Sequence, residues 1–180
     1  MGSGGIESSD VYFDAVKVPS GNMLGSKGKG FDILLHWIAL EKVEQCAANV
    51  GIAQAALDEA IKYTRTRKSR GKPVSDMQGI RWMLADVLAS VEAARWLTYR
   101  AAFLQDEGNP EWQVAAATAK LFVIPATIDV VEKSRRLHGG YGYTKELKIE
   151  RLCRAVFGAT GIATTLELNR SLVGGWLSRR

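Results

Sequence analysis

The feature that most restricts the fold of this chain is a helical repeat that continues over long stretches. In residues 30–66, apolar side chains recur every three or four positions, which is the repeat of one helix face. The residues of this stripe are Leu34, Leu35, Ile38, Val43, Ala47, Val50, Ala53 and Leu57. Gly71 and Pro73 follow, and they predict the end of this first helix. A helix with one apolar face must bury that face against other elements.

The same repeat predicts further helices along the chain. Their expected ranges are 75–105 or 76–105, then 109–137, 145–153 and 154–177. Asn109 is the expected cap of the third of the five predicted helices, with Pro110 at its first helical position. Pro125 is expected to bend that helix or to remove one of its hydrogen bonds. Long amphipathic helices with short loops predict an all-α fold: an antiparallel up-and-down four-helix bundle with an extra C-terminal helix.

The first 29 residues do not follow the helical repeat. Residues 1–10 begin with Met-Gly-Ser-Gly-Gly and are predicted to be a flexible lead or a cloning scar. Residues 11–29 start with VYFDAVKVP, which is rich in β-branched and aromatic side chains and predicts a short strand, followed by a glycine-containing loop. The helical domain is therefore expected to cover residues 30–180.

Composition and charge bear on several classes of protein. Cys46 and Cys153 form no C-x-x-C pair and the two histidines are isolated, so we expect no disulfide scaffold and no metal site, in a reducing cytoplasmic setting. No run approaches the roughly 20 uninterrupted apolar residues of a membrane span. The net charge of +5 suits an anionic partner such as a phosphate-bearing cofactor or an acyl-CoA. No recognised nucleic-acid-binding motif accompanies this charge.

Four segments, in order and at matching spacing, resemble the acyl-CoA dehydrogenase family. Residues 11–31 (VYFDAVKVPSGNMLGSKGKGF) resemble the last strand of the family's middle β-domain and the loop that enters its C-terminal domain. Residues 51–78 (GIAQAALDEAIKYTRTRKSRGKPVSDMQ) resemble the first helix of that domain, its basic turn and the following glutamine. LADVLASVEAARWLTYRAA resembles its second helix, and residues 137–154 (LHGGYGYTKELKIERLCR) resemble its glycine turn and Glu-x-x-x-Arg segment. The chain therefore resembles the C-terminal helical domain of the family.

This resemblance implies a flavin enzyme with a glutamate as catalytic base. The glutamate takes the α-proton of an acyl-CoA thioester, and the β-carbon delivers hydride to FAD, which leaves a 2-enoyl-CoA. In most members the glutamate stands in a Tyr-Glu-Gly-Thr stretch at the start of the last helix, where this chain has Ala163. Relatives of the isovaleryl-CoA and long-chain type carry it on the first helix, ten residues before the glycine that is Gly51 here. That position is Glu41, which we predict to be the base.

The resemblance also implies which residues contact FAD. Arg67 and Gln78 match an arginine and a glutamine that contact the FAD of a neighbouring subunit, and an arginine fork suits pyrophosphate. Gly139 and Gly140 match the turn that lets the backbone approach the pyrophosphate, and Arg136 stands where the family has a glutamine.

Two further residues complete the predicted site. Thr165 matches a threonine beside the flavin, and Lys42 matches an arginine near the CoA side. By the same resemblance, the partners are an electron-transferring flavoprotein and further copies of this chain in a dimer or tetramer. The isolated chain is expected to be a folded helical oligomer that binds FAD weakly or not at all and has no turnover.

Two other functions remain open from the sequence. One is a catalytically silent subunit that serves oligomerisation or assembly, which Ala163 supports and Glu41 opposes. The other is a flavin monooxygenase of the same fold, which would not need the glutamate.

Overall fold

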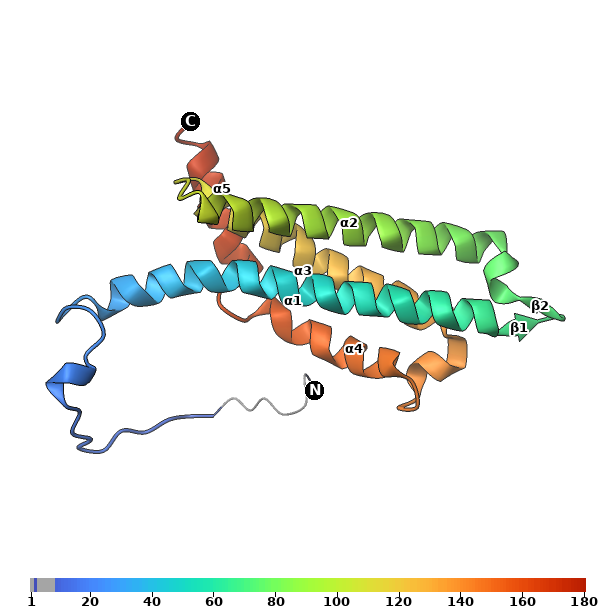
Figure 1. The fold of residues 1–180 in the computed structure, drawn as a ribbon, viewed down its shortest axis with the longest axis horizontal. Helices are drawn as coiled ribbons and strands as arrows, with labels where there is room; N and C mark the ends of the chain where they lie inside the picture. Colours follow the sequence, from blue (N-terminus) through green and yellow to red (C-terminus); the bar gives the residue numbers. More distant parts are fainter. Residues whose placement is uncertain (1, 3–8) are drawn as a thin grey trace.

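The computed structural model describes residue 2 and residues 9–180 and confirms the all-α fold (Figure 1). Three long helices run along its longest axis: α1 (Gly30–Thr66), α2 (Gln78–Asp106) and α3 (Trp112–Leu137). The shorter α4 (Lys148–Val156) contacts α1 and α3 and completes the up-and-down bundle. The extra helix α5 (Leu166–Leu177) packs against α3. Most of the predicted lead over residues 1–10 lies outside the described residues.

Short elements connect the helices. A two-residue turn at Arg70 and Gly71, both with positive φ (50° and 82°), joins β1 (Lys68–Ser69) to β2 (Lys72–Pro73). Positive φ at both turn positions is the geometry that closes a tight hairpin. Because this hairpin reverses the chain between α1 and α2, the predicted break at Gly71 and Pro73 is confirmed. The 3-10 turns are η1 (Ser20–Asn22), η2 (Val74–Asp76), η3 (Gly139–Tyr143) and η4 (Phe157–Thr160).

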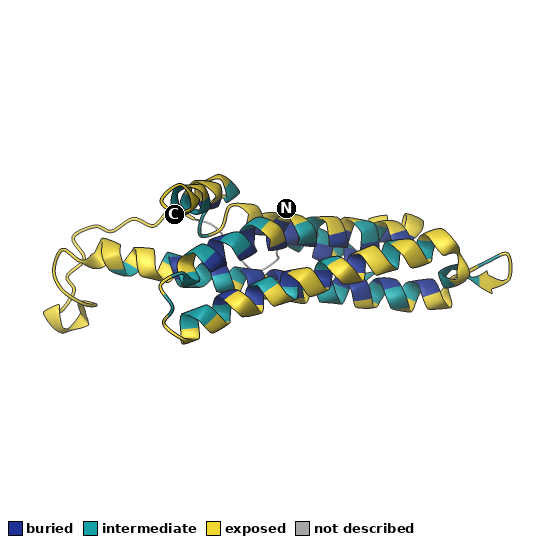
Figure 2. Ribbon diagram, turned by 90° about the horizontal axis from the view of Figure 1, so that it is seen from above, coloured by how far each residue is buried: buried dark blue, intermediate teal, exposed yellow. Residues whose placement is uncertain are grey.

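The central helix of the bundle is α3, which contacts α1, α2, α4 and α5. Small side chains on its first half allow close approach of the neighbouring helices. These are Ala115, Ala116, Ala117 and Ala119, all buried. From Val123 onward the core is filled by the larger Val123, Ile124, Val130 and Val131. Figure 2 shows the buried residues facing inward between the helices and exposed residues covering the outer faces.

By length and composition alone, α3 could cross a membrane, because its most apolar window has a mean hydropathy of 1.7. Within the bundle, 56% of that window is buried. A helix enclosed on several sides by other helices is expected to be apolar around most of its circumference, so packing accounts for this composition.

Two predicted elements are wrong. Residues 11–19 form no strand, because a strand needs a hydrogen-bonded neighbour and no other segment of residues 9–180 pairs with them. The predicted last helix over 154–177 is interrupted: α4 ends at Val156, and α5 begins only at Leu166. The backbone between them contains Gly158 and Gly161 and has a positive φ of 60° at Ala163, which is incompatible with a continuous helix.

Two predictions of detail also need correction. Regular helix α3 begins at Trp112 rather than at Pro110, although the Asn109 Oδ1 accepts a hydrogen bond from the Glu111 N–H (2.9 Å), as a capping side chain does. Leu34 and Leu35, predicted in the buried stripe, are 44% and 49% exposed. They lie in the first two turns of α1. Figure 1 shows the start of α1 projecting past the ends of the other helices.

Candidate functional site

The predicted site residues lie at opposite ends of α1. Glu41 lies in the first third of the helix, and Arg67 directly follows its last residue. The roughly 26 positions between them span about 39 Å at the helical rise of 1.5 Å per residue. We call the two regions the base end, around Glu41, and the phosphate end, around Arg67.

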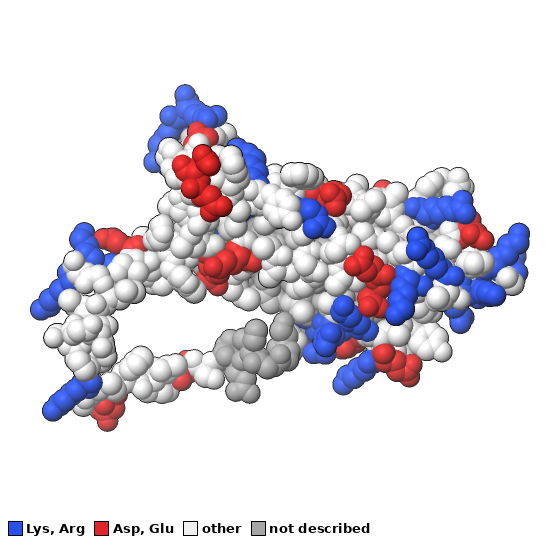
Figure 3. Space-filling view, viewed as in Figure 1, with Lys and Arg blue, Asp and Glu red and all other residues white. Residues whose placement is uncertain are grey.

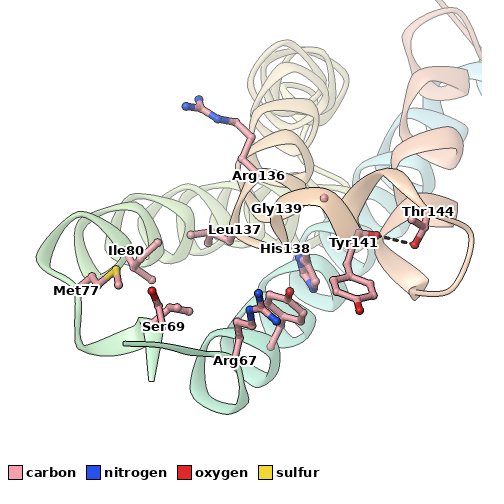
Figure 4. Close-up of a pocket in the computed structure, with 13 residues that line it drawn as sticks. Arg67, Ser69, Met77, Ile80, Arg136, Leu137, His138, Gly139, Tyr141 and Thr144 are labelled. Atoms are coloured by element: carbon pink, nitrogen blue, oxygen red, sulfur yellow. Dashed lines mark hydrogen bonds between the residues drawn. The ribbon is translucent and has the colours of Figure 1, made fainter. Parts of the chain in front are cut away.

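A pocket of about 630 Å³ opens at the phosphate end (Figure 4). It forms where the end of α1, the hairpin, the start of α2, the end of α3 and η3 meet. Its lining consists of Tyr63, Arg67, Ser69, Val74, Met77, Ile80, Arg136, Leu137, His138, Gly139, Gly140, Tyr141 and Thr144. Figure 3 shows Lys and Arg side chains gathered on this end of the molecule, so the surroundings of the pocket favour an anionic ligand.

The glycine turn over the pocket contains glycines with different roles. Gly139 has a positive φ of 58°, which favours glycine over other residues. A Cβ at Gly139 or at Gly140 would meet no atom within 4 Å, so the backbone there is open to a ligand. At Gly142 a Cβ would collide with the carbonyl oxygen of Arg135. Gly142 is therefore required by packing, whereas Gly139 and Gly140 leave room for a phosphate group beside the main chain.

An aromatic pair belongs to the lining of the pocket. The rings of Tyr63 and His138 lie with their centroids 4.6 Å apart. His138 is buried, and its Nδ1 lies 2.7 Å from the carbonyl oxygen of Ser134. Because a carbonyl can only accept, Nδ1 carries the proton in the neutral ring, and Nε2 is then an acceptor. This pair holds the end of α1, next to Arg67, against the end of α3.

The other two residues predicted at this end are less closely associated with the pocket. Arg136 belongs to its lining, but Figure 4 shows its guanidinium pointing away from Arg67 and His138. Gln78 is exposed at the first position of α2, next to the lining residue Met77. The structure thus brings Arg67, Gly139 and Gly140 together, with Arg136 and Gln78 at the margin.

At the base end, Glu41 is half-buried and belongs to a hydrogen-bonded chain between helices. The Gln45 Nε2 donates to Glu41 Oε1 at 3.3 Å. The Lys120 Nζ of α3 donates to Gln45 Oε1 at 2.9 Å and to the carbonyl oxygen of Ile162 at 2.5 Å. Lys120 is fully buried, and burial lowers its pKa. Through this chain the α1 carboxylate is connected to the loop that precedes α5.

That loop contains the other predicted residues of the base end. Thr165 caps α5, because its Oγ1 accepts a hydrogen bond from the Leu168 N–H at 3.3 Å. Ala163, at the family's alternative position for the base, lies two residues before it. Lys42 is buried in α1, and burial lowers its pKa. The structure thus gathers Glu41, Lys42 and Thr165 at one end of the bundle, in the same region as Ala163.

Three residues that support the base end and the phosphate end were not predicted from the sequence. Tyr63 stands four residues before Arg67, so the helical repeat could have placed both on one face. Gln45 stands four residues after Glu41 for the same reason. Lys120 lies within an apolar stretch of α3, where a lone lysine is itself a signal, because buried lysines are rare unless they have partners.

Comparison with known proteins decides the family. The profile of the "Acyl-CoA dehydrogenase, C-terminal domain" family matches residues 28–177, which is most of the chain. The chain belongs to the acyl-CoA dehydrogenase family. The family predicted from the resemblance in the sequence is thereby confirmed.

Named acyl-CoA dehydrogenases and related reductases are similar over most of the chain. The "Caffeyl-CoA reductase-Etf complex subunit CarC" of Acetobacterium woodii is 36% identical over 180 residues, which cover 100% of this chain and 47% of that protein. The short-chain-specific acyl-CoA dehydrogenase of Clostridium acetobutylicum is 36% identical over 172 residues, 96% of this chain and 45% of that protein. The chain therefore spans about half the length of the curated relatives it matches.

A solved structure gives the same result. Butyryl-CoA dehydrogenase from Megasphaera elsdenii superposes with a TM-score of 0.88 at 38% identity, over 93% of this chain and 43% of that one. Most of this chain thus has the fold of the corresponding part of butyryl-CoA dehydrogenase.

Proposed function

We propose that this chain is the C-terminal domain of a flavin-dependent acyl-CoA dehydrogenase, and that Glu41 is its catalytic base. One observation carries this proposal. The α1 carboxylate is half-buried and held by Gln45, in the region of the loop where Ala163 replaces the base of most family members. Because the chain spans about half of its relatives, the activity requires the parts that those relatives have beyond it.

The chemistry assigned to this domain is proton transfer at the α-carbon. Glu41 would accept the α-proton of an acyl-CoA thioester as the β-hydrogen departs with its electron pair. Bound FAD would supply the acceptor for that hydride. A positioned general base contributes typically about 10²- to 10⁴-fold in rate. The bond between Gln45 and Glu41 keeps the carboxylate in one orientation, which is the condition for such a contribution.

The phosphate end fits the anionic part of FAD. The guanidinium of Arg67 can form a paired hydrogen bond with a phosphate, and the open backbone at Gly139 and Gly140 permits close approach. The two ends of α1 are about 39 Å apart, which exceeds the reach of one FAD molecule. We therefore propose that the phosphate end of one copy serves the base end of another, so that the active protein is a dimer or a tetramer.

The names of the relatives bear on direction and on the electron partner. One relative is named as a subunit of a caffeyl-CoA reductase-Etf complex, and others are named "Acryloyl-CoA reductase (NADH)" and "Cyclohexane-1-carbonyl-CoA dehydrogenase". The same carboxylate can remove the α-proton in one direction and return it in the other. We propose an electron-transferring flavoprotein as the redox partner.

The substitution Glu41→Gln tests the base. In the complete protein loaded with FAD, anaerobic addition of butyryl-, isovaleryl- and octanoyl-CoA is expected to bleach the flavin of the wild type. In Glu41→Gln, FAD stays bound but the rate of bleaching falls at least about 10³-fold, since the amide cannot take a proton. Glu44→Gln is the matched control, because Glu44 is exposed on the same helix. Equal rates in wild type and Glu41→Gln would refute the assignment of Glu41.

Ala163 favours a second candidate, a subunit that assembles with an active enzyme and is itself silent. An alanine cannot accept a proton at the position where most members of the family carry the base. A protein that binds FAD, forms stable oligomers and is bleached by none of the three acyl-CoA esters would support this second function.

A further inference from the structure

We propose that Lys120 is a positioning residue of the base end, which orients Glu41 through Gln45 and also holds the loop that carries Thr165. This inference rests on the function proposed above, because it assigns a role toward the proposed base. It concerns a residue that would touch neither the substrate nor the flavin.

The burial of Lys120 requires a structural reason. Its side chain is 0% exposed, and a buried ammonium group is costly unless hydrogen-bond acceptors surround it. Two acceptors are present, the Gln45 Oε1 at 2.9 Å and the Ile162 carbonyl at 2.5 Å. The first belongs to α1 and the second to the loop before α5. The Lys120 ammonium group therefore joins α3 to α1 and to the loop before α5.

The chemistry of Lys120 determines which way the Gln45 amide faces. A lysine ammonium group can only donate, so Gln45 must turn its oxygen toward Lys120. Its NH₂ group then points to Glu41, and an ionised carboxylate can only accept. A Gln45 NH₂ group that donates to the carboxylate matches the hydrogen bonding of the proton-accepting form of Glu41. Without Lys120, the Gln45 amide could rotate and present its oxygen to the carboxylate.

The second bond holds a strained turn. The Ile162 carbonyl also accepts from the Thr164 N–H at 2.8 Å, and Ala163 between them has a positive φ of 60°. This is a three-residue γ-turn with positive φ, a rare and strained conformation. Such a backbone persists only when its surroundings fix it. The hydrogen bond from Lys120 to the same carbonyl holds this turn in place, directly before Thr165, which caps α5.

The charges around Lys120 point to the same role. Glu41, Lys42 and Cys46, all on α1, are the titratable groups that face it, while the α5 side contributes the Ile162 carbonyl. Burial raises the pKa of the Cys46 thiol to about 12, so this thiol is uncharged near neutral pH. Burial lowers the pKa of Lys42 and of Lys120. Among these three neighbours Glu41 is the one with a carboxylate, and its negative charge attracts the Lys120 ammonium group.

Two substitutions test the hydrogen-bonded path from Lys120 through Gln45 to Glu41, which we call the relay. They are made in the complete protein loaded with FAD. Lys120→Met removes the charge and both hydrogen bonds, whereas Gln45→Leu breaks the relay and leaves the bond to Ile162 in place. The rate of flavin bleaching is measured against pH, with whichever of the three acyl-CoA esters reduces the wild type fastest. Both variants are expected to lower the rate near pH 7 by about 10- to 100-fold. They should also move the acid limb of the profile, which is the range where the rate rises with pH, to a pH about one unit higher.

Other variants separate positioning from general damage. Val123→Ala removes a buried side chain of α3 three positions from Lys120, so it should lower Tm and leave the acid limb where it is. The double variant Lys120→Met/Gln45→Leu should move the limb no further than Lys120→Met does, because both substitutions break the same path. If Lys120→Met does not retain FAD, an unshifted acid limb in Gln45→Leu still overturns the role of Lys120, because the path from Lys120 to Glu41 runs through Gln45.

The outcomes distinguish this inference from the proposed function. If no ester bleaches the wild type, both are overturned. If the wild type is bleached and Glu41→Gln is not, the proposed function stands. In that case, Lys120→Met and Gln45→Leu profiles with the same acid limb as Val123→Ala would overturn the role of Lys120 alone. A shift in Gln45→Leu without one in Lys120→Met would also overturn it.

Discussion

The backbone at Gly142 lies so close to the carbonyl oxygen of Arg135 that no side chain can be added between them. This contact locks the 3-10 turn η3 onto the last turn of α3. It thereby fixes the position of Gly139 and Gly140 over the pocket at the phosphate end. The fold and the candidate cofactor site depend on the same contact.

Gly142→Ala should therefore destabilise the protein. The added methyl group collides with backbone atoms, which cannot move aside cheaply, and overpacking of this kind costs about 1–3 kcal/mol. Urea unfolding of this chain at fixed protein concentration measures the change. Gly140→Ala is the control, since its methyl group would meet no atom within 4 Å, and it should change the free energy of unfolding by less than about 0.5 kcal/mol. Equal effects of the two substitutions would contradict the packing role of Gly142.

Ala163→Gly should stabilise the chain. A left-handed conformation costs an alanine about 1–2 kcal/mol, and the greater freedom of glycine in the unfolded chain cancels about half of the gain. The expected net increase in the free energy of unfolding is about 0.5 kcal/mol. The same change at the exposed helical position Ala47 should cost about 1 kcal/mol. Opposite signs at the two positions are the prediction, and a loss of stability at both would contradict it.

Cys46 should make the stability of the chain depend on alkaline pH. The thiol has an ordinary pKa of 9.0, and burial raises this to about 12 in the folded chain. Between these values the folded chain binds more protons than the unfolded chain, so stability falls as pH rises, by up to about 1.4 kcal/mol per pH unit. Below pH 9 the thiol is protonated in both states, and this contribution is fully present.

The substitution Cys46→Ala isolates this effect. Near pH 7 the variant should be about 1–2 kcal/mol less stable than the wild type, because it leaves a small cavity. Above pH 9 the difference should shrink and then reverse, because the variant has no thiol to ionise. Lys42 and Lys120 are present in both proteins, so their own titration largely cancels. A difference that stays constant from pH 7 to 10.5 would contradict a buried, protonated thiol.

The isolated 180-residue chain should fold but should not turn over. Its helices bury two apolar clusters among themselves, so circular dichroism should show a cooperative helical unfolding transition. The chain should bind FAD weakly or not at all, because under the proposed function the flavin site also includes parts that relatives have beyond this domain. Purification as a yellow protein that acyl-CoA bleaches would show that this domain is sufficient.

The helical repeat predicted the bundle well because it is a local property with a strong period. The ends of α1 followed from the same repeat and from Gly71 and Pro73, and the structure places them at Gly30 and Thr66. The repeat could not show that Leu34 and Leu35 lie on a part of α1 that the bundle does not cover. Burial depends on where the neighbouring helices end, and the stripe itself carries no information on that.

The interruption before α5 was not predictable from the same kind of pattern. Ala163 is a good helix former, and its left-handed conformation follows from the turn between Ile162 and Thr164 rather than from its own preference. The candidate site was predicted from the resemblance to the family, whereas its supporting residues were not. Lys120 contacts Gln45 across 75 positions, and no local spacing indicates such a pair.

The length of α1 also determines how defects in different copies of the chain would combine. If two copies share each site, a copy changed at Glu41 and a copy changed at Arg67 each keep the end that the other has lost. A mixed pair of such copies would contain one intact site and one with both defects. Two individually inactive proteins would then complement each other on mixing, because no single helix of this length can present both of its ends to the same flavin.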